Sequence, residues 1–186
     1  MNLKEVIEEE LIINTKNKQL NFLYRKTLKE IFSSDYLNKI DNYFLKGLTI
    51  KNIKRKNNVV AITKGKDVSV NSLIYSNLPL ESAVMYLIHE TFHVLQNISV
   101  FNKVKEVNDK LCYVGMKLIP KDKINLFLTG KNQNIHSDPT KEFLTYFSNN
   151  VFVWDINPNL KPQFKKIIEQ AGIFNTNSNW WKKRIN

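Results

Sequence analysis

Cysteine is almost absent from this chain of 186 residues, and Cys112 is the only one. The chain therefore cannot form an internal disulfide, and we expect a reducing, cytoplasmic environment. No apolar run reaches the roughly 18 residues that a membrane helix needs, so the sequence predicts no membrane segment. Residues 1–10 are acidic and amphipathic, without the basic start and apolar stretch that are typical of a secretory signal.

Arginine is also scarce: Arg25, Arg55 and Arg184 are the only ones among 28 basic residues, and the net charge is +11. Because arginine is favoured for bidentate contacts to phosphate and guanine, its scarcity argues against a dedicated nucleic-acid binder. The lysine excess would still attract acidic proteins or nucleic acid. The basic runs at 51–56 and 180–184 are the candidate contact segments, although solvated loops and a tail are the plainer interpretation.

The composition, with 42% hydrophobic and 24% charged residues, is that of a globular protein. The length suits a single domain with a substantial core. We predict an α+β fold: a helical N-terminal part at 1–47, β-strands at 48–76, catalytic helices at 77–172 and a basic aromatic tail at 173–186.

The periodicity of apolar residues locates the individual elements. Strands are predicted at 48–54, 59–63 and 68–76, pairing mostly antiparallel. Helices are predicted at 3–11, 20–31, 33–47, 79–97, 100–118, from 139 to about 151, and at 161–172.

Histidine is scarce too, yet two of the three histidines fall in the motif H-E-T-F-H at 89–93. Positions four apart share one face of a helix, so His89 and His93 can both point at one ion, as zinc requires. Glu90 would lie beside the ion, where it can take a proton from a water molecule. The helix is otherwise apolar, and burying three ionisable groups without metal or partners costs several kcal/mol. The alternative is a core helix whose polar groups are satisfied by hydrogen bonds.

A catalytic zinc ion usually has three protein ligands. Glu142 is favoured as the third, because a helix that begins at Pro139 can offer its first turn to the motif helix. His136 and Asp138 are the alternatives, and a surface glutamate near a helix N-terminus is the plainer interpretation of Glu142. Tyr146 and His136 are candidates for stabilising a developing oxyanion, although either can equally be an ordinary core or surface residue.

Strands followed by the H-E-x-x-H motif and then by a helix with a glutamate resemble the small gluzincin metallopeptidases, also called minigluzincins. The resemblance covers roughly residues 59–151. It implies a zincin-like fold in which His89, His93 and Glu142 bind one Zn²⁺ ion and Glu90 is the general base. The sequence departs from that family at Tyr146, where many members have an aspartate that supports a motif histidine.

The expected function is therefore that of a zinc-dependent metallohydrolase. We predict a peptidase that hydrolyses protein or peptide substrates with zinc-activated water and with Glu90 as general base. The alternative is a non-catalytic zincin-like module that binds acidic protein or nucleic acid through its lysine-rich surface.

Overall fold

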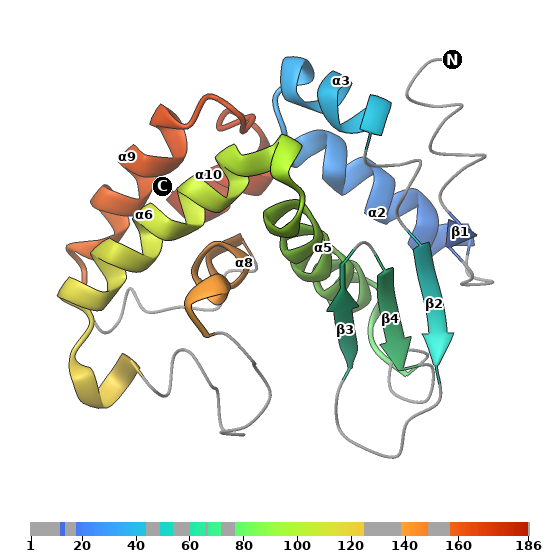
Figure 1. Cartoon of the computed structure of the whole chain (residues 1–186), viewed down its shortest axis with the longest axis horizontal. Coiled ribbons are helices and arrows are strands. Elements are labelled where there is room, and N and C mark those ends of the chain that lie inside the picture. The colour runs from blue at the N-terminus through green and yellow to red at the C-terminus, as the bar shows by residue number, and fades with distance from the viewer. Residues whose placement is uncertain are drawn as a thin grey trace.

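The computed structural model describes residues 12–13, 18–43, 49–53, 60–65, 67–71, 77–124, 139–148 and 157–185. Within these ranges the chain forms a mostly helical α+β fold with one small sheet (Figure 1). The strands are β1 (Ile12–Ile13), β2 (Thr49–Ile53), β3 (Ala61–Lys64) and β4 (Asp67–Asn71). The helices are α2 (Lys18–Ile31), α3 (Ser34–Tyr43), α5 (Leu80–Asn97), η1 (Ser99–Phe101), α6 (Asn102–Leu118), η2 (Pro139–Lys141), α8 (Glu142–Ser148), α9 (Leu160–Gln170) and α10 (Asn179–Ile185).

The sheet has the strand order β1-β2-β4-β3. The pairs β1–β2 and β2–β4 are parallel, and the hairpin β3–β4, which turns at Gly65 with a φ of 60°, is antiparallel. The prediction of a mostly antiparallel sheet is therefore wrong for the described strands. Alternation of apolar residues determines which face of a strand is buried, but it does not determine strand direction. Here β4 lies between β2 and β3, so two strands that follow each other in sequence are not paired.

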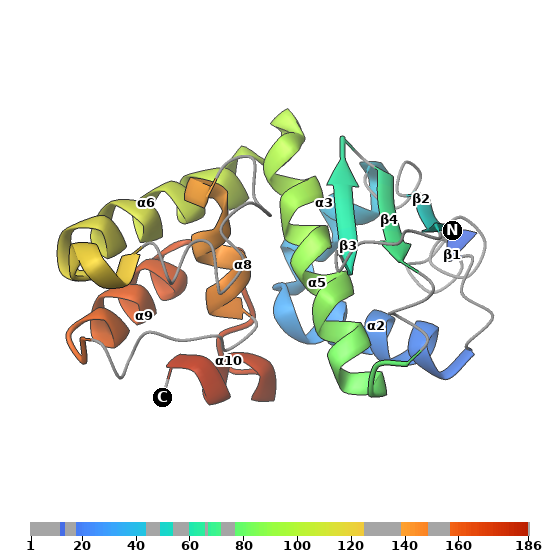
Figure 2. The ribbon, with the colours of Figure 1, turned by 90° about the horizontal axis from the view of Figure 1, so that it is seen from below.

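Helix α5 is the centre of the fold. It lies between the sheet and the group formed by α6, α8, α9 and α10 in both views (Figures 1 and 2). It contacts β3, β4, α2, α6 and α8. Its apolar residues, including Leu87, Ile88 and Leu95, are buried because this helix meets protein on most of its sides. The predicted helix at 79–97 is confirmed, with Pro79 directly before its first turn.

The two middle residues of the motif fasten α5 to the rest of the core. The Tyr24 hydroxyl donates to Thr91 Oγ1 at 2.6 Å, and Thr91 donates its own hydrogen to the Leu87 carbonyl at 2.7 Å. The centroid of the Phe92 ring lies 5.8 Å from that of Phe32 and 6.3 Å from that of Phe174. Thr91 and Phe92 thus face the core.

The C-terminal segment packs against the domain. Trp181 in α10 is fully buried, and its indole donates to the Ile31 carbonyl at 2.8 Å. Arg184 is also buried: it donates to the Ser148 and Trp180 carbonyls, and its guanidinium lies 3.6 Å from the Trp180 ring centroid. Burial lowers the pKa of Arg184 to about 10.

Only part of the predicted basic surface can be placed. In the run at 180–184, Lys182 and Lys183 are exposed, whereas Arg184 lies inside the protein. The side chains of the run at 51–56 lie outside the described residues, as does the helix predicted at 3–11. None of the helices in the described part of the chain is long and apolar enough to cross a membrane.

Candidate metal centre

The motif helix brings two imidazoles together. His89 and His93 are one turn apart on α5, and their Nε2 atoms lie 3.0 Å from each other. The two rings are tilted by 75°, with their centroids 4.7 Å apart. Both Nε2 atoms therefore face the same small space, as the i and i+4 spacing predicts.

Glu142, the first residue of α8, completes the cluster from a distant part of the chain. Its Oε2 lies 3.2 Å from His89 Nε2, and its Oε1 lies 3.2 Å from His93 Nε2. Each of the three residues offers a ligand atom within 4.8 Å of the others. Zinc bonds to nitrogen and oxygen are about 2.0–2.1 Å long, so tetrahedral ligand atoms lie about 3.3 Å apart. The cluster has the dimensions of such a site, and the residue Glu142 is only 3% exposed.

Two buried amide side chains hold the turn that presents Glu142. Asn108 on α6 donates to the Thr140 carbonyl at 2.9 Å and accepts from the Leu144 amide at 3.1 Å. Gln96 on α5 donates to the Lys141 carbonyl at 3.2 Å. The backbone on both sides of Glu142 is thus bonded to the two neighbouring helices.

Contacts within α8 and with α6 determine the position of Glu142 further. The Thr145 hydroxyl lies 2.8 Å from the Glu142 carbonyl oxygen and 3.1 Å from Glu142 Oε2. The next residue, Phe143, packs directly on Gly115, where an added Cβ would overlap the ring. Helix α6 can approach α8 this closely only because residue 115 has no side chain.

The nearby carboxylates act on the pKa of His93. Burial by itself lowers the pKa of His93, but the hydrogen bond and the negative charge of Glu142, with a contribution from Glu90, raise it above its ordinary value overall. Burial, followed by the charge of Glu142, also raises the pKa of Tyr146. Tyr146 is therefore a neutral phenol at physiological pH, and its ring centroid lies 5.6 Å from that of His89.

Glu90 has a different set of partners from the three clustered residues. It is 7% exposed, and Thr63 Oγ1 donates to its Oε2 at 2.5 Å. It does not belong to the group of possible metal ligands. Glu90 directly follows His89 on α5, and its negative charge contributes to raising the pKa of His93.

The structure thus brings together His89, His93 and Glu142, with Glu90 and Tyr146 close by. The other two candidates, His136 and Asp138, lie outside the described residues. Sequence reasoning missed four residues that support the site: Thr63, Gln96, Asn108 and Thr145. A signal existed for Gln96, which follows His93 by three positions and so shares its helical face. Thr63 and Asn108 reach the site through tertiary packing, which the spacing of residues along the chain does not reveal.

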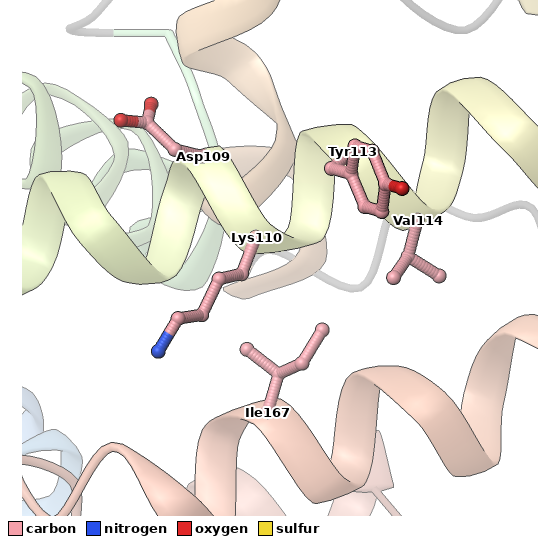
Figure 3. Close-up of a pocket in the computed structure, with 5 residues that line it drawn as sticks. All are labelled: Asp109, Lys110, Tyr113, Val114 and Ile167. Atoms are coloured by element: carbon pink, nitrogen blue, oxygen red, sulfur yellow. The ribbon is translucent and has the colours of Figure 1, made fainter.

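A hollow between α6 and α9 lies apart from this cluster (Figure 3). It measures about 380 Å³ and is lined by Asp109, Lys110, Tyr113, Val114 and Ile167. None of the three clustered residues lines it, so it does not form part of the candidate metal centre.

The sequence matches no protein-family model, and neither a curated protein nor a solved structure is significantly similar to it. The case for a function therefore depends on the chemistry of the site itself.

Proposed function

We propose that this protein is a zinc-dependent metallohydrolase that cleaves peptide bonds, with zinc held by His89, His93 and Glu142. The observation that carries the proposal is the spacing of the three ligand groups, whose atoms lie 3.0–3.2 Å apart. A further glutamate, Glu90, directly follows His89 on the same helix and is not among the three ligand groups.

The set of donors favours zinc. Two imidazoles and one carboxylate are the ligands of many hydrolytic zinc sites, and three protein ligands leave a fourth position for water or substrate. Cations such as magnesium and calcium prefer oxygen ligands throughout. The same donor set supports the resemblance to the gluzincin metallopeptidases, with His89, His93 and Glu142 in the ligand positions.

Bound zinc would supply a Lewis acid that acidifies a water molecule and polarises a carbonyl group. In the proposed reaction Glu90 accepts a proton from the attacking water, whose oxygen bonds to the carbonyl carbon of the peptide. Glu90 then delivers that proton to the amide nitrogen as the C–N bond breaks. Tyr146, as a neutral phenol near His89, donates a hydrogen bond to the oxyanion. His136 is the other candidate for this last role.

The direct test is Glu90→Gln. Wild-type protein should copurify with about one zinc ion and hydrolyse a mixture of fluorogenic peptides. The variant should keep its zinc, because Glu90 is not a ligand, and should lose activity by about 10²-fold or more. Zinc content by elemental analysis and initial rates of peptide cleavage measure the two effects.

The matched control is Glu106→Gln, which neutralises an exposed glutamate on α6. It should change neither zinc content nor rate. Full activity of Glu90→Gln would contradict the mechanism, and a wild-type protein that binds no zinc would contradict the metal centre. Zinc binding by a wild-type protein that cleaves no peptide would favour the non-catalytic module instead.

A further inference from the structure

Thr63 contacts Glu90 from the edge strand of the sheet. In the β3–β4 hairpin Thr63 pairs with Val68 and Ala61 pairs with Val70. Paired residues direct their side chains to the same face of a sheet, and Val68 and Val70 are buried. Thr63 therefore lies on the buried face, against α5, which contacts both strands.

The geometry of the contact determines which way the hydrogen bond runs. Thr63 Oγ1 is 2.5 Å from Glu90 Oε2 and 3.3 Å from the Glu90 backbone carbonyl oxygen. The hydroxyl has one hydrogen, and both of these partners are acceptors, so Thr63 is the donor. The shorter distance assigns the main bond to the carboxylate, as expected for a charge-assisted hydrogen bond.

A glutamate side chain has several rotatable bonds, and a general base must lie within hydrogen-bond reach of the proton that it abstracts. Fixing one carboxylate oxygen restricts those rotations and leaves the second oxygen to bond the water. The contact to Thr63 joins the carboxylate to a strand of the sheet, whereas the backbone of Glu90 belongs to α5. The orientation of the carboxylate is thus held from outside its own helix.

We propose that Thr63 is a positioning residue for the general base Glu90. This inference rests on the proposed function, since it assigns Thr63 a part in the same reaction. Thr63 acts through Glu90 alone, so its loss should affect the rate of the chemical step and leave zinc affinity unchanged.

The test compares three substitutions in the full chain. Thr63→Val keeps the shape of the side chain without the hydroxyl, and Thr63→Ser and Thr63→Ala differ from each other only by the hydroxyl. We expect kcat to fall about tenfold to a hundredfold in the Val and Ala variants, since displacement of a catalytic group by about 1 Å has effects of this size. Thr63→Ser should stay within about threefold of wild type, because the donor is retained.

Two further measurements separate positioning from a merely structural role. The KM for a fluorogenic peptide and the zinc dissociation constant should change less than about threefold in all three variants, because Thr63 is not among the three ligating residues and is proposed to act only through Glu90. The ¹³C resonance of the Glu90 carboxyl carbon should shift in the Val and Ala variants and stay near its wild-type position in Ser. The control is Thr27→Val, which removes a part-buried hydroxyl that donates to the Leu23 carbonyl on α2. It should leave kcat and the Glu90 resonance unchanged.

The inference is overturned if Thr63→Ala and Thr63→Ser have the same kcat, or if their zinc affinity falls in parallel with kcat. If Thr63→Val does not fold, the Ser and Ala pair decides the matter alone. Failure of the proposed function is recognised separately, because it shows in the wild-type protein and in Glu90→Gln before any Thr63 variant is measured.

Discussion

At the scale of single residues, the carboxylate of Glu142 has a third partner in addition to the two histidines. The Thr145 hydroxyl also reaches its Oε2, at 3.1 Å. Groups that hydrogen-bond a metal ligand orient it, and their loss commonly weakens metal binding by about 10–100-fold. Thr145 is therefore a determinant of the site although it cannot touch the ion itself.

Thr145→Val should weaken zinc binding about tenfold, because Glu142 loses the hydroxyl that donates to its backbone carbonyl at 2.8 Å and lies 3.1 Å from its Oε2. The measurement is competition for zinc with a chelating dye. Ser148→Ala is the matched control, since the Ser148 hydroxyl donates to the Thr145 carbonyl in the same buried helix but has no contact with Glu142. Equal zinc affinities of the two variants would show that the contact from Thr145 does not orient the ligand.

The sequence indicated the cluster residues better than those that support them. His89 and His93 follow from helical spacing, whereas Glu142 was favoured over His136 and Asp138 from the helix start at Pro139 and the need for a third ligand. Asn108 and Thr63 could not be found in this way, because an amide and a hydroxyl are common on the surface of any protein. Their roles depend on which backbone or carboxylate the tertiary fold places beside them.

At the scale of elements, the close approach of α6 to α8 determines where Glu142 lies. Gly115 is buried in the last turn of α6, in direct contact with the Phe143 ring. The same two helices are also joined by a hydrogen bond from the Leu144 amide on α8 to the Asn108 side chain on α6. A change in the separation of the two helices would therefore be transmitted to Glu142, which precedes Phe143.

Gly115→Ala should lower the free energy of unfolding by about 1 kcal/mol. Overpacking in a core costs about 1–3 kcal/mol, and the better helix propensity of alanine returns part of that. Zinc affinity should also fall, since Phe143 must move and Glu142 precedes it. Denaturant unfolding and dye competition measure the two effects. Met116→Ala, on the exposed side of the same helix, is the control. A more stable variant with unchanged zinc affinity would contradict the prediction.

The elements also differ in how well the sequence predicted them. The helix at 79–97 is confirmed because its apolar residues and Pro79 define it locally. The strands were located approximately and β3–β4 is antiparallel as expected, but β2 pairs with β4 in the parallel direction, against the prediction of a mostly antiparallel sheet. Strand partners are chosen by contacts between distant segments, which a local pattern does not report.

At the scale of the whole molecule, zinc would join two segments that are far apart in sequence. His89 and His93 lie on α5, which packs on the sheet, and Glu142 lies on α8, which packs on α6. Both segments share one core, in which the Phe174 ring contacts the Phe92 and Trp181 rings. An ion bound by both segments stabilises the folded chain, because the unfolded chain does not hold the three ligands together.

Added zinc should therefore raise the melting temperature of the metal-depleted protein. At a free zinc concentration 100 times the dissociation constant, the stabilisation is about 2.7 kcal/mol. For a chain of this length that corresponds to a rise of about 5–10 °C. Differential scanning calorimetry with buffered zinc measures the shift. The same titration of Glu142→Gln should show a much smaller rise, and an equal rise would exclude Glu142 as a ligand.

The inward direction of Thr91 and Phe92 has a practical consequence for protein engineering. A motif written as H-E-x-x-H suggests that its two middle letters are interchangeable, yet in this protein one accepts a hydrogen bond from Tyr24 and the other fills an aromatic cluster. Transplanting the five residues onto a foreign helix would supply two imidazoles and a carboxylate. It would not supply the contacts to Thr91 and Phe92 that determine how the helix is rotated about its axis. A graft that keeps this site would have to include the receiving surface behind the helix as well.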